Sequence, residues 1–287
     1  MPPLRIAVPN KGRLSDPALG MMRDIGLPVV GLGRTLVAHL AGGAIEVLFA
    51  RAEDIPEFVE LGAADIGITG SDLVREAGAE VETLLPLGFG ICRLVVAVPE
   101  HSLMKTVEDI PDAAVVATAF PRITGEYFRE KGKVLTVVPV SGATEITPYI
   151  GVSDLITDLA ETGSTLKKNH LTQIGTICEV SAVLVGNRAK CCEKEHEVHE
   201  VVAAMASVLQ AKEKRYLMAN VPKSSLDEVR RLVPGVSGPT VMNLAGTDGM
   251  VAIHAVVPEK SINGLVPPLK KLGATGILVL PIERMVV

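Results

Sequence analysis

The residues best suited to chemistry lie between Gly151 and Asn169, in the segment GVSDLITDLAETGSTLKKN. Side chains alternate along a strand, so Asp154 and Asp158 would share one face just before a polar loop. That loop offers backbone N–H groups, hydroxyls and a helix start to an anion. We predict a phosphate cradle here, with the two carboxylates available for ribose hydroxyls or a magnesium ion. A simple helix-capping turn is the alternative for the loop taken alone.

A second set of charged residues follows the first apolar run of the chain, in the segment PNKGR. Lys11 and Arg13 lie where a strand passes into a helix that begins with Ser15, Asp16 and Pro17. Cations in such a loop are natural ligands for phosphate, although solvated loop cations are the plainer alternative. We predict that both contact an anionic ligand.

Short apolar runs alternate with helical patterns from the start of the chain, which predicts βαβ units and parallel sheets. The sequence also contains an internal echo of the pattern Gly-x-x-Asp. Gly62 and Asp65 form it before ITGSD, and Gly151 and Asp154 form it before the polar loop. Ligands of open α/β sheets bind at the carboxyl ends of strands. We therefore predict two lobes facing each other across a cleft, each with one loop. Common turn chemistry would also explain the echo.

The pattern changes after residue 192. Apolar residues spaced three and four apart predict one long amphipathic helix from Glu193 to about Arg215. The tail then reads strand, helix, strand, strand, helix, strand, which is the order of a ferredoxin-like domain. We expect a first lobe of residues 1–88 and 175–210, a second lobe of residues 89–174, and a third domain of residues 214–287.

Composition narrows the function classes. The 287 residues are 48% hydrophobic but only 3% aromatic, which favours an aliphatic α/β core. A formal net charge of −5 and the few aromatic residues argue against nucleic acid. Charges, Gly or Pro interrupt every apolar run before it reaches about 18 residues, and the N-terminus does not read as a signal peptide. We expect a cytoplasmic protein with no membrane partner and four reduced cysteines.

The segment from Asp158 to Leu166 resembles the 5-phosphoribosyl-pyrophosphate (PRPP) loop of phosphoribosyltransferases. Further stretches are similar to the ATP phosphoribosyltransferase family: Glu145 with GVSDLITDLAETGSTL, PNKGRLS, DIPEFVELGAADIGITGSD, the GxCRL of Gly90–Leu94, and GATGILVLPIERM. The resemblance covers almost the whole chain and is to the long form of the family. It implies an α/β core of the two-lobed periplasmic-binding-protein-like (type II) class, followed by a ferredoxin-like (ACT-like) α+β domain.

The family's reaction joins ATP and PRPP to give phosphoribosyl-ATP and pyrophosphate, the first step of histidine biosynthesis, and it requires Mg²⁺. Such a pentosyltransferase would act by positioning and electrostatics, with no covalent nucleophile. A cytoplasmic binding or sensor module of the solute-binding type, without catalysis, is the alternative function.

The resemblance assigns roles to particular residues. Catalysis is assigned to Lys11, Arg13, Arg51 and Glu145. PRPP binding is assigned to Asp154, Asp158, Glu161, Thr162, Gly163, Ser164, Thr165 and Leu166, and Mg²⁺ to the two aspartates. ATP binding is assigned to Lys11, Gly12, Arg13, Gly70, Asp72 and Arg93. Which basic group contacts which phosphate stays open, and Asp65 is open to a purely structural role.

The resemblance also implies control. The long form is inhibited by histidine at its C-terminal domain, where modules from different subunits pack together. The matching positions here are Asn220, Thr240, Ala255, Gly273 and Gly276. Asn220 departs from the acid that the family often has there, which predicts weaker pairing with the ligand's cation. An inhibitor acts by favouring an inactive state, so we expect active dimers and inhibited hexamers, with AMP as a further ligand.

One cluster of metal-type residues carries no prediction of a site. Cys191 and Cys192 precede His196 and His199, but adjacent cysteines chelate poorly and the usual two-to-four-residue spacing is missing. A solvated helix start is the expected structure.

Overall fold

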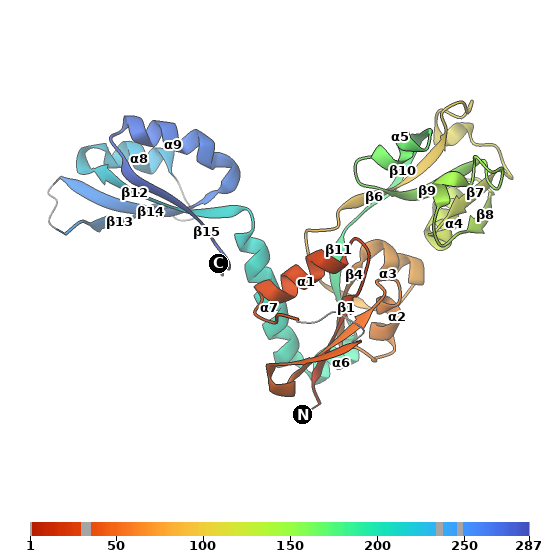
Figure 1. Ribbon diagram of the computed structural model, residues 1–287, viewed down its shortest axis with the longest axis horizontal. Coiled ribbons are helices and arrows are strands. Elements are labelled where there is room, and N and C mark those ends of the chain that lie inside the picture. The colour runs from red at the N-terminus through yellow and green to blue at the C-terminus, as the bar shows by residue number, and fades with distance from the viewer. Residues whose placement is uncertain (1, 30–35, 234–237, 246–248, 287) are drawn as a thin grey trace. The chain divides into compact units, whose positions relative to one another are not determined.

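A computed structural model describes residues 2–29, 36–233, 238–245 and 249–286. The chain forms two compact units, Met1–Glu200 and Val201–Val287. Strands and helices alternate through both units (Figure 1). The short 3-10 helices of the described ranges are Ala41–Gly43, Val107–Asp109, Thr144–Ile146, Lys223–Ser225 and Glu259–Ser261.

The first unit contains two sheets. The first sheet has the strand order β2-β3-β1-β4-β11-β5, and we name it, with its helices, the first lobe. Its strands are β1 (Leu4–Pro9), β2 (Val37–Leu40), β3 (Ile45–Ala50), β4 (Ile66–Gly70), β5 (Glu82–Pro86) and β11 (Ala182–Gly186). Its helices are α1 (Ser15–Asp24), α2 (Ile55–Glu60) and α3 (Ser71–Ala77). β1 pairs in parallel with β3 and β4, so the carboxyl ends of these strands meet at one edge of the sheet.

The second sheet has the order β10-β6-β9-β7-β8, and with its helices it forms the second lobe. Its strands are β6 (Cys92–Pro99), β7 (Val115–Thr118), β8 (Thr136–Pro139), β9 (Leu155–Ala160) and β10 (Leu171–Val180). Its helices are α4 (Pro121–Glu130) and α5 (Ser164–Lys168). β7 pairs in parallel with β8 and β9, whereas β6 is antiparallel to β9 and β10.

The chain passes between the lobes twice. It leaves the first sheet after β5 and enters the second at Cys92, and it returns at Ser181, between β10 and β11. Residues 175–180, which the sequence analysis assigns to the first lobe, belong to the second sheet instead. The reason is that β10 keeps its antiparallel pairing with β6 as far as Val180, opposite Cys92. The α/β class predicted for the core is confirmed.

The repeated G-x-x-D motif has the same structure in both lobes. Asp65 Oδ2 accepts a hydrogen bond of 2.7 Å from the N–H of Arg5, and Asp154 Oδ2 accepts one of 2.8 Å from the N–H of Val115. The N–H groups of the two aspartates donate in return to the carbonyl oxygens of Arg5 and Val115. Each aspartate therefore holds the start of its own strand, β4 or β9, beside the start of the neighbouring strand, β1 or β7.

The long helix predicted from Glu193 to about Arg215 is present as one helix, α7 (Glu195–Ala211), which ends earlier than predicted because a strand begins at Lys214. A separate short helix, α6 (Arg188–Glu193), precedes it. Lys194 separates them, with φ −127° and ψ 40°. Its ammonium group donates to Asp65 Oδ2 at 2.6 Å and to the carbonyl oxygen of Pro3 at 2.7 Å. The interruption thus places a cation against a buried carboxylate.

The second unit holds the later part of α7 and a four-stranded antiparallel sheet of order β13-β14-β12-β15. Its elements are β12 (Lys214–Pro222), α8 (Leu226–Leu232), β13 (Thr240–Asn243), β14 (Met250–Pro258), α9 (Ile262–Lys271) and β15 (Thr275–Pro281). This is the predicted ferredoxin-like order. Leu217, Val229, Ile253 and Leu269 belong to one buried cluster of sheet and helix residues.

Aliphatic side chains build the interior of both lobes, as the composition predicts. Ile6 and Ile68 in the first sheet and Leu94 and Val96 in the second have no exposed surface. The four cysteines are free thiols. Within the described ranges, no helix has the length and apolar character needed to cross a bilayer.

The pair formed by Asp65 and Lys194 gives a first prediction. Both side chains are nearly buried, with exposures of 3% and 12%, so Lys194→Met leaves the carboxylate without its cation. We expect a loss of about 3–5 kcal/mol in the free energy of unfolding, measured by chemical denaturation. Lys190→Met breaks the exposed pair with Glu193 and is the matched control, which should cost less than about 1 kcal/mol. Equal losses would contradict the structural role of the buried pair.

Candidate active site

The polar loop between β9 and α5 lines a cavity of about 270 Å³, which we name the loop cavity. Its lining residues are Glu145, Asp158, Leu159, Ala160, Glu161, Thr162, Gly163, Ser164, Thr165 and Leu166. Gly163 has a φ of 73°, a conformation that favours glycine, and it immediately precedes α5. N–H groups in a first helical turn have no intrahelical partners, and here hydroxyl groups surround them. The loop cavity therefore has the character of an anion site, and only second-lobe residues build it.

Two carboxylates share the loop cavity. Burial, opposed by a hydrogen bond from the N–H of Leu159 and assisted by the negative charge of Glu145, raises the pKa of Asp158 to about 6. The Asp158 carboxyl is thus ionised at neutral pH in surroundings that disfavour its charge. A cation or a pair of hydroxyl donors brought by a ligand would stabilise it.

Asp154 does not join these two carboxylates. It lies at the amino end of β9, where it is bonded to Val115, and it does not line the loop cavity. Four residues of extended strand separate it from Asp158 by about 13 Å. The prediction that both aspartates hold one ion beside the loop is therefore wrong for Asp154. Side-chain alternation places two residues on one face of a strand, but it does not bring them to the same end.

A second cavity, of about 190 Å³, lies where the two lobes meet, and we name it the interlobe cavity. The first lobe contributes Lys11, Gly12, Arg13, Leu14, Ala52, Glu53, Asp72 and Leu73, and the second contributes Phe120 and Leu159. Leu159 also lines the loop cavity, so the two cavities are neighbours.

Arg13 is fixed in the interlobe cavity by two contacts. Its guanidinium donates to the carbonyl oxygen of Gly90 at 2.6 Å and to Asp72 Oδ2 at 3.0 Å. The Asp72 side chain is fully buried, and its Oδ1 has no hydrogen-bond partner among the described residues. Gly70 is needed beside it, because a Cβ there would lie 2.1 Å from that oxygen. The cavity thus offers two cations, Lys11 and Arg13, and a buried carboxylate fixes the second of them.

Two of the predicted arginines lie at the edges of these cavities. Arg51 follows β3, its side chain is 58% exposed, and it pairs with Glu53 at 3.9 Å. Arg93 on β6 is exposed and in register with Ala160, the last residue of β9 before the loop. Neither arginine is among the residues that line the loop cavity or the interlobe cavity.

Sequence reasoning missed several residues of the interlobe cavity. Phe120 has a recognisable signal, because it stands between β7 and Pro121, and a proline in the first turn marks a helix that starts at the carboxyl end of a strand. Leu73 and Leu159 have none, since apolar residues beside strands read as core. Asn10 Oδ1, at the end of β1, is a further buried acceptor without a partner in the described chain.

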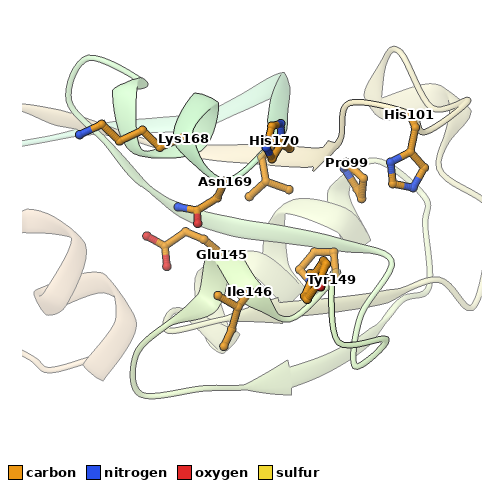
Figure 2. Close-up of a pocket in the computed structure, with 10 residues that line it drawn as sticks. Pro99, His101, Glu145, Ile146, Tyr149, Lys168, Asn169 and His170 are labelled. Atoms are coloured by element: carbon orange, nitrogen blue, oxygen red, sulfur yellow. The ribbon is translucent and has the colours of Figure 1, made fainter.

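A third cavity, of about 260 Å³, lies on the other side of Glu145 (Figure 2). Figure 2 shows Lys168, Asn169 and His170 along one side of it and Glu145, Ile146 and Tyr149 along the other. The helix α5 therefore has its first residues at the loop cavity and its last residue at this one.

The five positions assigned to histidine are only partly together. Asn220 and Gly276 are neighbours, since a Cβ on Gly276 would lie 3.3 Å from Asn220 Nδ2. Thr240 is exposed at the start of β13, and Gly273 forms a turn after α9 with a φ of 85°. The Ala255 side chain is buried in the core under the helices, on the opposite face of the sheet from Asn220. It therefore cannot contact a ligand held by the Asn220 side chain.

The acidic residues fit one mode of magnesium binding. Among the described residues, no group of three or more His, Cys, Asp or Glu side chains is arranged to hold a metal ion. Mg²⁺ often keeps several waters and binds through one or two carboxylates together with substrate phosphates. Asp158 and Glu145, which face one cavity, suit that mode.

Comparison with known proteins shows the family of the chain. The family described as HisG, ATP phosphoribosyltransferase, matches residues 51–207, and the HisG C-terminal domain matches residues 211–284. The ATP phosphoribosyltransferase of Methanothermobacter thermautotrophicus is 48% identical over 284 residues, 99% of each chain. That of Methanocaldococcus jannaschii is 47% identical over 286 residues, 98% of this chain and 99% of the relative.

The chain belongs to the ATP phosphoribosyltransferase family. The predicted enzyme class and the catalytic role in histidine biosynthesis are thereby confirmed, and the non-catalytic alternative has no support. The chain is also similar to a solved chain from the ATP phosphoribosyl transferase (HisG:HisZ) complex of Thermotoga maritima, with 29% identity and a TM-score of 0.62. The match covers 96% of that chain but 71% of this one. The extra length and the C-terminal domain match agree with the predicted long form.

The raised pKa of Asp158 predicts a pH-dependent stability. In the unfolded chain this carboxyl titrates near its ordinary pKa of 3.8, whereas in the folded chain it titrates at about 6. Between these values the unfolded state binds fewer protons, so the contribution of Asp158 to the free energy of unfolding falls as pH rises and is fully lost above the folded pKa.

Asp158→Asn removes this unfavourable charge, so it should raise the denaturation midpoint at about pH 8 and have little effect at about pH 4. Urea unfolding followed by circular dichroism at the two pH values measures the difference. A variant that is less stable than the parent chain at the higher pH would contradict the assignment.

Proposed function

We propose that PRPP binds in the loop cavity of the second lobe. Its 5-phosphate lies against the first turn of α5, among the hydroxyl groups of Thr162, Ser164 and Thr165. Its ribose hydroxyls face Asp158 and Glu145, whose carboxylates can accept hydrogen bonds from them. The anion-binding character of the loop and the raised pKa of Asp158 support this arrangement.

ATP, in this proposal, binds in the interlobe cavity. Lys11 and Arg13 contact its phosphates, and the buried Asp72 carboxylate holds the Arg13 guanidinium in place for this contact. Gly12 and Gly70 let the ligand and the Asp72 side chain approach the backbone closely. Arg51 and Arg93, at the cavity edges, are proposed as additional phosphate contacts.

The observation that carries the proposal is the adjacency of the two cavities through Leu159. The residue before it, Asp158, faces the ribose, so a purine in the interlobe cavity lies next to the sugar in the loop cavity. Adenine N1 can then form a bond to the anomeric carbon while the bond to pyrophosphate breaks, and the electron pair leaves with pyrophosphate.

The residues around the sugar suit that step. Positive charge develops on the anomeric carbon and ring oxygen, and the carboxylates of Asp158 and Glu145 stabilise it electrostatically. The fixed positions of the two substrates supply the rest of the rate enhancement, because no covalent nucleophile is required. Mg²⁺, when bound with the substrate at Asp158 and Glu145, neutralises charge on the pyrophosphate group.

Asp158→Asn tests the PRPP site. The change removes a charged acceptor, so PRPP binding should weaken about tenfold or more in titration calorimetry, while ATP binding changes little. Asp154→Asn is the matched control on the same strand, because its amide oxygen can still accept the hydrogen bond from Val115 N–H, and it should leave the affinity for PRPP unchanged. In the parent enzyme, the KM for PRPP should rise as the pH falls through about 6, where Asp158 gains its proton. An equal loss of both ligands in Asp158→Asn would refute the assignment.

The finer parts of the function are also proposals. We place the enzyme in the cytoplasm. Its domains in this proposal are a first lobe (1–88 and 181–210), a second lobe (89–180) and a regulatory domain (214–287). Histidine binds the regulatory domain at Asn220 and Gly276, with Thr240 and Gly273 supplied by the same or another copy. Histidine favours an inhibited hexamer over an active dimer, and AMP competes for the ATP cavity.

An assay with ATP, PRPP and Mg²⁺ tests activity and control together. Phosphoribosyl-ATP should form, histidine at about millimolar concentration should suppress it, and light scattering should show larger particles in the same samples. Asn220→Asp should lower the histidine concentration needed, since a carboxylate pairs with the ligand's cation. Absence of product would refute the enzyme, whereas product insensitive to histidine at unchanged particle size would refute only the control.

A further inference from the structure

The two lobes meet at a second place besides the crossing strands, where the end of α3 contacts the start of α4. The Glu76 carboxylate on α3 accepts hydrogen bonds from the N–H groups of Arg122 at 2.8 Å and Ile123 at 3.0 Å. These are the second and third residues of α4, whose N–H groups have no partner within the helix. Phe120, at the N-cap position, provides no side-chain acceptor. A carboxylate from the first lobe therefore caps a helix of the second.

Charged side chains surround this cap. Arg75, next to Glu76, pairs with Glu126 of α4 at 3.1 Å, and Arg122 pairs with the same carboxylate at 3.3 Å. Hydrogen bonds from these two arginines lower the pKa of Glu126. Gly78 ends α3 so closely beneath the Arg122 guanidinium that a Cβ there would lie 1.5 Å from Nη1. The flanking pairs are exposed and individually weak. The strongest interaction of the contact is therefore that of the Glu76 carboxylate, which accepts two charge-assisted hydrogen bonds at the positive end of α4.

The contact lies directly beside the interlobe cavity. Glu76 follows Asp72 by four residues, so both lie on one face of α3, and Asp72 lines the cavity. On the other side, Phe120 precedes α4 and lines the same cavity. Glu76 thus connects the two elements that form opposite walls of this cavity. The loop cavity differs, because residues of the second lobe alone build it.

We propose that Glu76 is a positioning residue for ATP, which acts by holding the two lobes at the separation that completes the interlobe cavity. It contacts no substrate. The inference rests on the proposed location of ATP. A residue that only stabilised the fold would affect ATP and PRPP binding alike, whereas this role of Glu76 affects ATP binding alone. Loss of the Glu76 contact opens the cavity shared by the lobes and leaves the PRPP cavity intact.

Glu76→Ala tests this directly. Titration calorimetry should show ATP binding weakened about tenfold, because the competent closed state is less populated, with PRPP affinity within about twofold of the parent enzyme. The KM for ATP should rise by a similar factor while kcat at saturating substrates changes little. Glu76→Gln retains one acceptor oxygen and should give an intermediate loss. Glu130→Ala, on the exposed end of α4, is the matched control and should bind both substrates normally.

These binding measurements distinguish failure of the proposed function from failure of the proposed role of Glu76. If the parent enzyme binds neither ATP nor PRPP, the proposed function itself fails. If it binds both, and Glu76→Ala either leaves ATP affinity unchanged or weakens the two ligands equally, the role of Glu76 is refuted. Should Glu76→Ala not fold, Arg75→Ala removes the neighbouring interlobe pair. It should then raise the KM for ATP two- to threefold without changing PRPP affinity, and no selective change would overturn the inference.

Discussion

Carboxylates that hold the starts of strands set the register on which the active site depends. Asp65 and Asp154 each bind the backbone of the neighbouring parallel strand at both its N–H and its C=O. With the starts aligned, the carboxyl ends of β1 and β4 come to one edge of the first sheet, and those of β7 and β9 to one edge of the second. The loops that leave these edges are the ones that line the two cavities. The same contact between an aspartate and a neighbouring strand, present once in each lobe, therefore helps to position the loops that line the cavities.

The two lobes contribute unequally to that chemistry. The second lobe builds the loop cavity by itself, and a buried group of hydroxyls from Thr118, Thr124 and Thr157 ties α4 to β7 and β9 beneath it. The start of α4 is therefore rigidly related to the strand that carries Asp158. A contact from the first lobe to the start of α4, such as that of Glu76, positions the whole loop cavity and not only one helix.

Much of this arrangement could be predicted from the sequence, because periodicity and turn residues report on local structure. Alternating apolar runs predicted both α/β lobes, and the strand–helix order after Lys214 predicted the ferredoxin-like domain. The resemblance of residues 158–166 to a known loop singled out the segment that lines the loop cavity. Contacts between residues far apart in the sequence were harder to predict. The alternation of Asp154 and Asp158 indicated a shared face, but it did not indicate that Asp154 binds the neighbouring strand. The helix pattern after Glu193 likewise did not indicate the distant carboxylate that Lys194 contacts just before the helix begins. Glu76 contacts the backbone of the other lobe, and local sequence patterns do not describe such a contact.

The structure also explains why four aspartates in similar motifs differ in role. Asp65 and Asp154 stand at the starts of strands, where each carboxylate accepts a hydrogen bond from the backbone of the neighbouring strand, and Asp65 also pairs with Lys194. Asp72 and Asp158 stand at or beyond the ends of the same strands, β4 and β9, in surroundings that leave them incompletely satisfied. Asp72 keeps a buried oxygen without a partner in the described chain, and burial raises the pKa of Asp158. Such incompletely satisfied groups destabilise a folded chain, and groups of this kind are common at functional sites. The repeated motif thus places a carboxylate that binds the neighbouring strand at the start of each strand. It is followed by an incompletely satisfied carboxylate near the end of that strand.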